Sequence, residues 1–246
     1  MIRRLHLLAV LPLLTVPLSA QAASQVGSAA AVRNDVTGSI AGQMQNGSSV
    51  HQDETVSTGT DSSTQLLFLD KTSLTMGPTS QVKIDKFVYN PNTGTAGTSV
   101  DLVKGALRVI TGSKHPENFT VQTPLANTGV RGSVAELYVS NMGFEFFLLI
   151  EGSIEVCAAS NNCQFLSNPG QFIMITPEGR MFPPAPWPGP MLDLTASVAF
   201  LETYFSSIIR QYDVLPQYRD LNDALRAGTF KAPDFTPFCF GEGCPP

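Results

Sequence analysis

The sequence predicts a mainly β protein with a small helical appendage at its C-terminal end. Only 14% of its 246 residues are charged. From residue 25 to residue 175, short runs of β-forming residues alternate with Gly, Pro, Asn or Asp, which is the pattern of strands and turns. No helical period interrupts these runs with comparable strength, whereas apolar residues recur at spacings of three and four after residue 190. We therefore expect a twisted array of short strands followed by helix.

The first 22 residues predict a cleavable signal peptide. Arg3 and Arg4 precede an apolar run from 5 to 18, and a small-x-small cleavage pattern ends at Ala22/Ala23. The run is shorter than the roughly 20 residues that cross a bilayer, and no later run is long enough to act as an anchor. We expect a periplasmic or secreted protein with no transmembrane segment after cleavage.

Charge and motifs narrow the possible partners. The net charge of −5 disfavours nucleic acid. The sequence contains no phosphate-binding glycine loop, dinucleotide fingerprint or calcium-loop pattern, so neither a cofactor nor a metal ion is expected.

The β domain is expected to span residues 23–181. Its candidate strands, in chain order, are Val26–Val32, Glu54–Ser57, Thr64–Leu69, Ser73–Met76, Gln81–Ile84, Val100–Val103, Leu107–Thr111, Phe119–Thr123, Val134–Val139, Phe144–Ile150, Ile154–Val156, Gln164–Leu166 and Gln171–Ile175. Between them, tight reversals are expected at 70–72, 77–80 and 151–152, and a longer loop at 89–99.

The stretch from Thr123 to Ser133 predicts a strand stopped by Pro124, a turn at Gly129 and a second strand from Ser133. The residues expected to form structural turns, here and at the 151–152 reversal, are Gly129, Arg131, Gly132 and Gly152. For Arg131, bracing of neighbouring turns is favoured over ligand binding.

The four cysteines form two close pairs, Cys157 with Cys163 and Cys239 with Cys244. In an exported protein two local disulfides are the simplest interpretation. A zinc site is the alternative, but neither spacing fits a zinc knuckle and no histidine lies near either pair.

Composition changes at 182–190, where closely spaced prolines predict a stiff linker to a helical segment at 191–246. A second short helix is expected at 220–227. The first helix would present an apolar face that either packs on the β domain or binds a partner, formed by Val198, Leu201, Phe205, Ile208 and Tyr212 and widened by Phe200, Tyr204 and Ile209.

No catalytic residue is expected. After signal cleavage the only histidines are His51 and His115, both in polar surroundings, and Ser133 begins an alternating strand. The enzymatic alternative is hydrolysis of an envelope polysaccharide by two acids on or beside strands, chosen from Asp70, Asp85, Asp101, Glu136 and Glu151.

An ordered set of motifs over residues 50–176 resembles the FecR domain family. The first half contains Thr58-Gly59, the run 66–70, and Ser73 to Pro78 with Ser80. The second half contains 105–109, 119–124, Ala126, Val130-Arg131-Gly132-Ser133, Glu151-Gly152 and Pro169-Gly170-Gln171.

The resemblance implies a β-solenoid-like domain in Gram-negative envelopes that binds or relays a signal without enzyme activity. In the iron-sensing regulators of this family, the domain follows a cytoplasmic anti-sigma segment and a membrane helix. This chain is expected to depart from that plan, since a cleavable signal peptide is predicted at residues 1–22. It also has Lys71 where the family commonly has glycine, and Ser133 in place of threonine.

We therefore expect a periplasmic module that contacts an envelope protein or glycan through its β surface, the 90–98 loop or the C-terminal helix. A self-associating structural or surface β protein is a further alternative.

Overall fold

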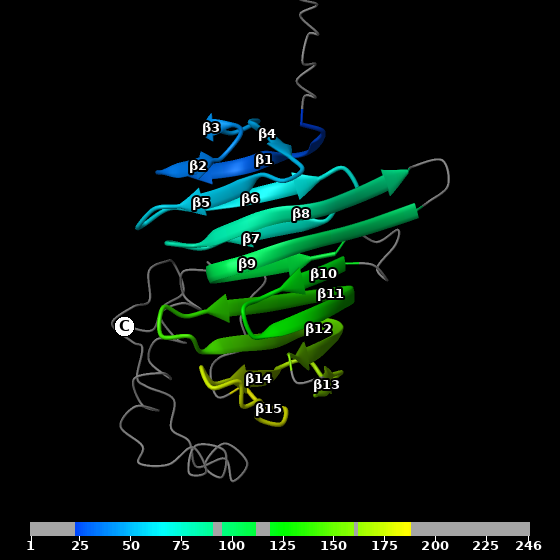
Figure 1. The fold of residues 1–246 in the computed structure, drawn as a ribbon. Coiled ribbons are helices and arrows are strands. Elements are labelled where there is room, and N and C mark those ends of the chain that lie inside the picture. Colours follow the sequence, from blue (N-terminus) through cyan, green and yellow to red (C-terminus); the bar gives the residue numbers. More distant parts are fainter. Residues whose placement is uncertain (1–22, 91–94, 112–118, 160–161, 188–246) are drawn as a thin grey trace, which may run out of the picture.

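A computed structural model describes residues 23–90, 95–111, 119–159 and 162–187 (Figure 1). These residues form strands and no helix, so the prediction of a mainly β fold is confirmed. The strands are β1 (Gln25–Arg33), β2 (Val36–Gly38), β3 (Gly42–Gln43), β4 (Ser49–His51), β5 (Thr55–Thr58), β6 (Ser63–Phe68), β7 (Ser73–Met76), β8 (Gln81–Asn90), β9 (Thr95–Ile110), β10 (Phe119–Gln122), β11 (Ala126–Val139), β12 (Glu145–Ala158), β13 (Cys163–Leu166), β14 (Gln171–Ile175) and β15 (Ala185–Pro186).

The strands pair into one large sheet whose main path runs β15-β14-β12-β11-β10-β9-β7-β6-β1-β4. Among the strand pairs in the described part of the chain, β9 with β10 is parallel and the others are antiparallel. A solenoid stacks parallel strands from successive coils. The prediction of a β-solenoid-like fold is therefore wrong, because hairpins such as β6–β7, β8–β9 and β11–β12 reverse the chain instead of coiling it.

Several predicted short strands are segments of long ones. The predicted strands 100–103 and 107–111 both lie in β9, except for Thr111, and the predicted strands 144–150 and 154–156 both lie in β12, except for Phe144. The predicted reversal at Glu151-Gly152 is wrong, because β12 continues through it. Gly129 likewise lies within β11, where it pairs with Thr120 and Glu155, and not in a turn.

A bulge explains why the glycines there suggested turns. The register of β11 against β12 shifts between Arg131 and Ala135, and both Gly132 and Gly152 have positive φ, at 59° and 81°. Extra residues in a bulge bend the strand and increase its twist without ending it. Sequence alone does not separate this use of glycine from a reversal, because both need positive φ.

The main core lies on one face of these strands. Leu74, Val109, Ala135 and Leu137 are each buried within one apolar cluster that extends from β1 to β14. Along each strand these side chains alternate with those of the opposite face, as the two-residue period of a β-strand requires.

The proline-rich segment is described as far as residue 187. Ala185 pairs with Phe172 of β14, and Phe182 and Trp187 are buried. Prolines are tolerated here because β15 is an edge strand. The predicted signal peptide at 1–22, the rest of the linker, the helical segment with its apolar face (Val198, Leu201, Phe205, Ile208 and Tyr212), the 220–227 helix and the Cys239–Cys244 pair lie outside the described residues, as do parts of the 90–98 loop.

Across the described ranges, no helix is present that could cross a bilayer.

Candidate functional site

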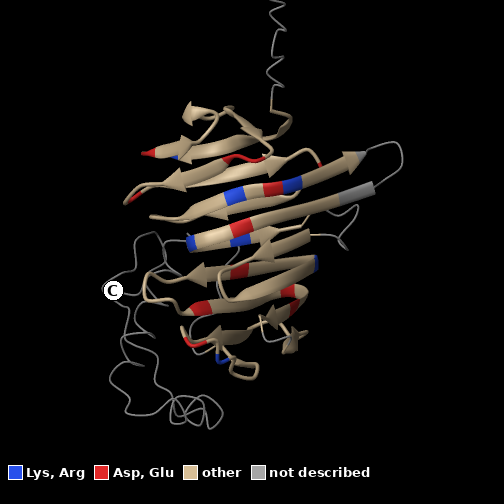
Figure 2. Cartoon of the chain, viewed as in Figure 1, with Lys and Arg blue, Asp and Glu red and all other residues tan. Residues whose placement is uncertain are grey.

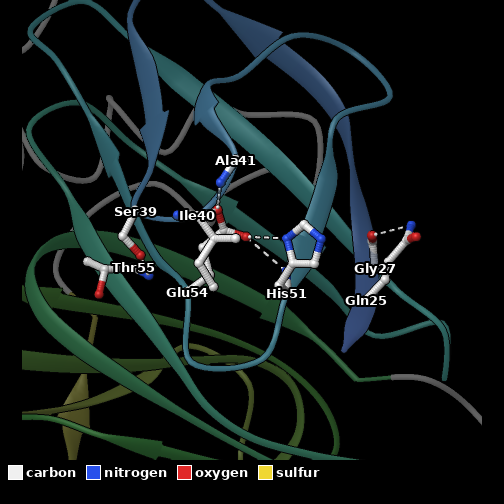
Figure 3. A network of polar contacts seen from close by, with 8 residues as sticks. All are labelled: Gln25, Gly27, Ser39, Ile40, Ala41, His51, Glu54 and Thr55. Carbon is white, nitrogen blue, oxygen red and sulfur yellow. Dashed lines mark hydrogen bonds and ion pairs between the residues drawn. The ribbon is translucent and has the colours of Figure 1, made fainter. Parts of the chain in front are cut away.

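Glu54 is a fully buried carboxylate that ties together three segments of the N-terminal region (Figure 3). Its Oε1 accepts hydrogen bonds from the backbone N–H groups of Ala41, at 2.7 Å, and Ile40, at 3.2 Å. Its Oε2 accepts from the backbone N–H of His51 at 2.8 Å and lies 3.2 Å from His51 Nδ1. Both carboxylate oxygens accept hydrogen bonds from backbone N–H groups of neighbouring segments, so the role of Glu54 is structural.

The local sequence places Glu54 in this position. It directly precedes β5 and is in phase with Val56 and Thr58, whose side chains are also buried. Gly38 on β2 leaves space for the carboxylate, since a Cβ there would collide with Glu54 Oε1. Sequence reasoning missed Glu54, although its phase with Val56 and Thr58 is a readable signal.

Glu145 is a second buried carboxylate that sequence reasoning missed. Thr123 Oγ1 donates to its Oε2 at 2.6 Å and the Leu125 N–H donates to its Oε1 at 2.9 Å. Burial raises the pKa of Glu145 to about 7, and the hydrogen bonds from Thr123 and Leu125 act in the opposite direction. Glu145 thereby holds the 123–125 turn, which is where the chain reverses between β10 and β11.

Glu136, one of the acids considered for catalysis, forms a buried ion pair with Arg108. The two residues pair across β9 and β11, and the guanidinium contacts Glu136 Oε1 through both Nε and Nη2. Burial raises the pKa of Glu136, while Arg108 acts to lower it. A carboxylate held by arginine and closed to solvent cannot reach a polysaccharide.

The other candidate acids lie apart from Glu136. Asp70 Oδ1 accepts the Thr72 N–H at 2.9 Å in the β6–β7 turn, and Glu151 is exposed at the β12 bulge. The structure brings together Asp85 and Asp101. Burial, followed by the charge of Asp85, raises the pKa of Asp101.

A lysine accompanies the Asp85 and Asp101 pair. Lys83 Nζ lies 3.6 Å from Asp85 Oδ1, and Lys83 is the cross-strand neighbour of Asp101. Lys83 acts to lower the pKa of Asp101. This is a surface ion cluster, without the enclosed acid and base that glycoside hydrolysis uses.

Ser133 is a structural residue of the bulge. Its side chain is buried, and its Oγ accepts the Ser153 N–H at 2.9 Å and lies within hydrogen-bond distance of two carbonyls, those of Ser153 at 2.6 Å and Arg131 at 2.7 Å. Arg131 itself is exposed, and within the described ranges no hydrogen bond or ion pair of its guanidinium is found, so the expected bracing is not seen there. His115 lies outside the described residues.

The Cys157–Cys163 disulfide is present and joins directly paired residues of β12 and β13. Glu155 lies near both sulfur atoms, and the three residues have a spacing that could suit a metal ion. Because both sulfurs are used in the S–S bond, they are not available as thiolate ligands.

A candidate binding feature in the described residues is the outer part of β8. Figure 1 shows β8 and β9 extending beyond the neighbouring strands. β5 pairs with residues 81–83 of β8, and Ile84 exchanges backbone hydrogen bonds with Asp53 and Glu54. From Asp85 to Asn90, no described strand pairs with this edge of β8. We refer to residues 85–90 as the open β8 edge.

Side chains on the open β8 edge differ on its two faces. Phe87 stacks on the core residue Phe68, with ring centroids 5.6 Å apart, and Tyr89 lies against Phe87 at 6.3 Å. On the opposite face Lys86 and Val88 are exposed. Figure 2 shows positive and negative residues close together on β8 and on the facing part of β9. The edge thus offers unpaired backbone groups beside apolar and charged side chains, which suits peptide binding.

Part of the chain matches a protein-family model. Residues 54–155 match the family model described as FecR protein. The match begins at the buried Glu54 and ends within β12, and it confirms the resemblance expected from the motifs.

Two crystal structures of a candidate anti-sigma factor from Parabacteroides distasonis ATCC 8503 are similar to the chain. The one at 1.65 Å resolution has 14% identity and a TM-score of 0.42, and the similarity covers 52% of this chain and 57% of that chain. The one at 2.50 Å resolution has 16% identity and a TM-score of 0.47, covering 64% of this chain and 71% of that chain. A search of curated protein sequences gave no match.

Proposed function

Since residues 54–155 of the chain match the FecR family model, we propose that the protein is a non-enzymatic module of the cell envelope that relays a signal by binding another envelope protein. The proposal places the mature chain in the periplasm or outside the cell, in agreement with the signal-peptide pattern at 1–22. The disulfide between Cys157 and Cys163 is typical of such an oxidising compartment.

The observation that carries the proposal is the open β8 edge. An extended segment of a partner would add a strand beside residues 85–90 and satisfy their free backbone groups. The bulge at Asp85 and the charge of Lys86 discourage unselective pairing with other strands, because twisted and charged edges accept few partners. Val88, which is 41% exposed, would contact alternate side chains of the added strand.

The experiment compares two surface variants of the mature protein. Val88→Arg changes the open β8 edge, and Phe165→Arg changes an exposed apolar residue of β13 as a matched control. Each variant carries an affinity tag and is crosslinked in envelope extract from the native host. We expect Val88→Arg to capture at least about tenfold less of one specific protein than the unmodified chain, and Phe165→Arg to capture it undiminished.

Equal capture by both variants would remove the open β8 edge as the binding site. If the unmodified chain captures no specific protein, the binding function itself is wrong. Circular dichroism of both variants establishes that each retains its β structure.

A further inference from the structure

The sheet has a second buried face, opposite the main core, at β9, β11, β12 and β14. Strand register places the side chains of this face in two rows. One row contains Arg108, Glu136, Leu148 and Phe172, and the next contains Ala106, Tyr138, Phe146 and Met174. We refer to these two rows as the second face.

The second face is as inaccessible as the core. Its eight residues have relative exposures between 0% and 6%, yet none belongs to the core cluster. From Ser133 to Val139 every residue of β11 is buried, and so is every residue of β12 from Glu145 to Leu149. Strands that are buried at consecutive positions have both faces covered.

The chain arrives at this face where the described residues end. Ala185 of β15 pairs with Phe172, and the Trp187 ring packs edge-on against the Phe172 ring with centroids 5.5 Å apart. Residues 188–246 follow directly. Their local concentration at the second face is therefore high, because they are tethered at its edge.

We propose that residues 198–212 cover the second face as an amphipathic helix. The residues that would face the sheet are Val198, Leu201, Phe205, Ile208 and Tyr212. The helix would complete a sheet-and-helix layer on this side of the domain. It would also keep the Arg108–Glu136 pair away from water, because an apolar cover leaves no room for solvent beside the ions.

The dimensions permit this arrangement. Ten residues lie between Trp187 and Val198, and an extended chain of that length reaches about 30 Å. Three strand spacings separate β14 from β9 through β12 and β11, about 15 Å in all. A helix over 198–212 would be about 22 Å long and about 10 Å wide, enough to span most of the second face.

The test uses the full mature chain and its single tryptophan, Trp187. The double variant Phe205→Asp/Ile208→Asp charges the proposed contact. The matched control Thr203→Asp/Ser206→Asp charges the opposite side of the same helix. We expect the first variant to shift the Trp187 emission to longer wavelength and to increase its quenching by acrylamide, and the control to leave both unchanged.

A second measurement needs no substitution. In the unmodified chain, amide hydrogen exchange over 198–212 should be at least about tenfold slower than in an unstructured peptide. Sedimentation velocity should show a monomer. Exchange at the unstructured rate, or an unchanged Trp187 signal in the first variant, would overturn the proposal. A dimer that the first variant dissociates would also overturn it, because a second copy would then cover the face.

Discussion

The carboxylate of Glu54 accepts the backbone N–H of Ala41 at 2.7 Å, in the turn between β2 and β3, and so joins that turn to the start of β5. The same side chain accepts the His51 N–H from the other direction. A buried side chain that pairs otherwise unsatisfied backbone donors contributes more stability than an exposed ion pair, because its loss leaves those donors without water.

Replacing Glu54 by Gln is therefore expected to destabilise the domain by about 3 kcal/mol, since one carboxylate oxygen becomes an amide group that cannot accept the backbone donors on its side. Urea unfolding followed by circular dichroism measures the change. The paired variant Gly38→Ala should also destabilise, because its Cβ would collide with Glu54 Oε1.

Gly129→Ala is the control for Gly38→Ala. It also lies in a strand, but nothing is within 4 Å of a Cβ at that position. If Gly38→Ala were no more destabilising than Gly129→Ala, the close approach of the Glu54 carboxylate to Gly38 would not contribute to the stability of the domain.

Prediction from sequence succeeded where a short run of β-forming residues lies between turn residues. The predicted strand Ser73–Met76 coincides with β7, and Gln171–Ile175 coincides with β14. It failed where glycine lies inside a long strand: Gly152 lies at the bulge of β12, and Gly129 pairs in regular register within β11. The distinction depends on tertiary pairing, which continues the strands on both sides of Gly152.

Less of the candidate site could be predicted from the sequence. Glu136 was recognised as a strand acid, but its pairing with Arg108 depends on the register of β9 against β11, which sequence alone leaves open. Glu145 lies immediately before a continuous apolar run, and only the folded chain places it beneath the 123–125 turn.

Lys71 has a left-handed backbone conformation, with φ of 73°, at the position where the family commonly has glycine. Its N–H still donates to the Phe68 carbonyl at 3.0 Å, so the turn forms despite the side chain. Lys71→Gly should stabilise the protein by about 1 kcal/mol, because glycine avoids the steric cost of positive φ. Thermal unfolding measures the gain. Lys104→Gly, in β9 without positive φ, should instead be destabilising, and a loss of stability in both variants would contradict the explanation.

The raised pKa of Glu145 predicts a pH dependence of stability. The ordinary value of 4.5 applies to the unfolded chain and about 7 to the folded chain, so the folded state binds the extra proton between these values. The stabilising contribution is complete below pH 4.5 and is lost as the pH rises through about 7, with a total change of roughly 3 kcal/mol.

Glu145→Gln keeps the shape of the protonated carboxyl and should flatten this part of the stability profile, measured by urea unfolding between pH 4 and 8. The exposed Glu151→Gln is the control and should leave the slope unchanged. A profile for Glu145→Gln as steep as that of the unmodified protein would contradict a buried, protonated Glu145.

Gly152, at the bulge between β11 and β12, can be compared with Gly179, which lies after β14. Gly152 and Gly179 have nearly the same φ, 81° and 80°. A Cβ on Gly152 would lie 2.6 Å from the Gly132 carbonyl oxygen and 2.9 Å from Ser133 Cα, whereas nothing lies within 4 Å of a Cβ on Gly179.

Both alanine variants incur the backbone cost of about 1–2 kcal/mol, but only Gly152→Ala must also separate the two strands. We expect Gly152→Ala to lower the unfolding free energy by at least about 2 kcal/mol more than Gly179→Ala. Equal losses would mean that the conformation of Gly152, and not the close packing of the bulge, determines why glycine is there.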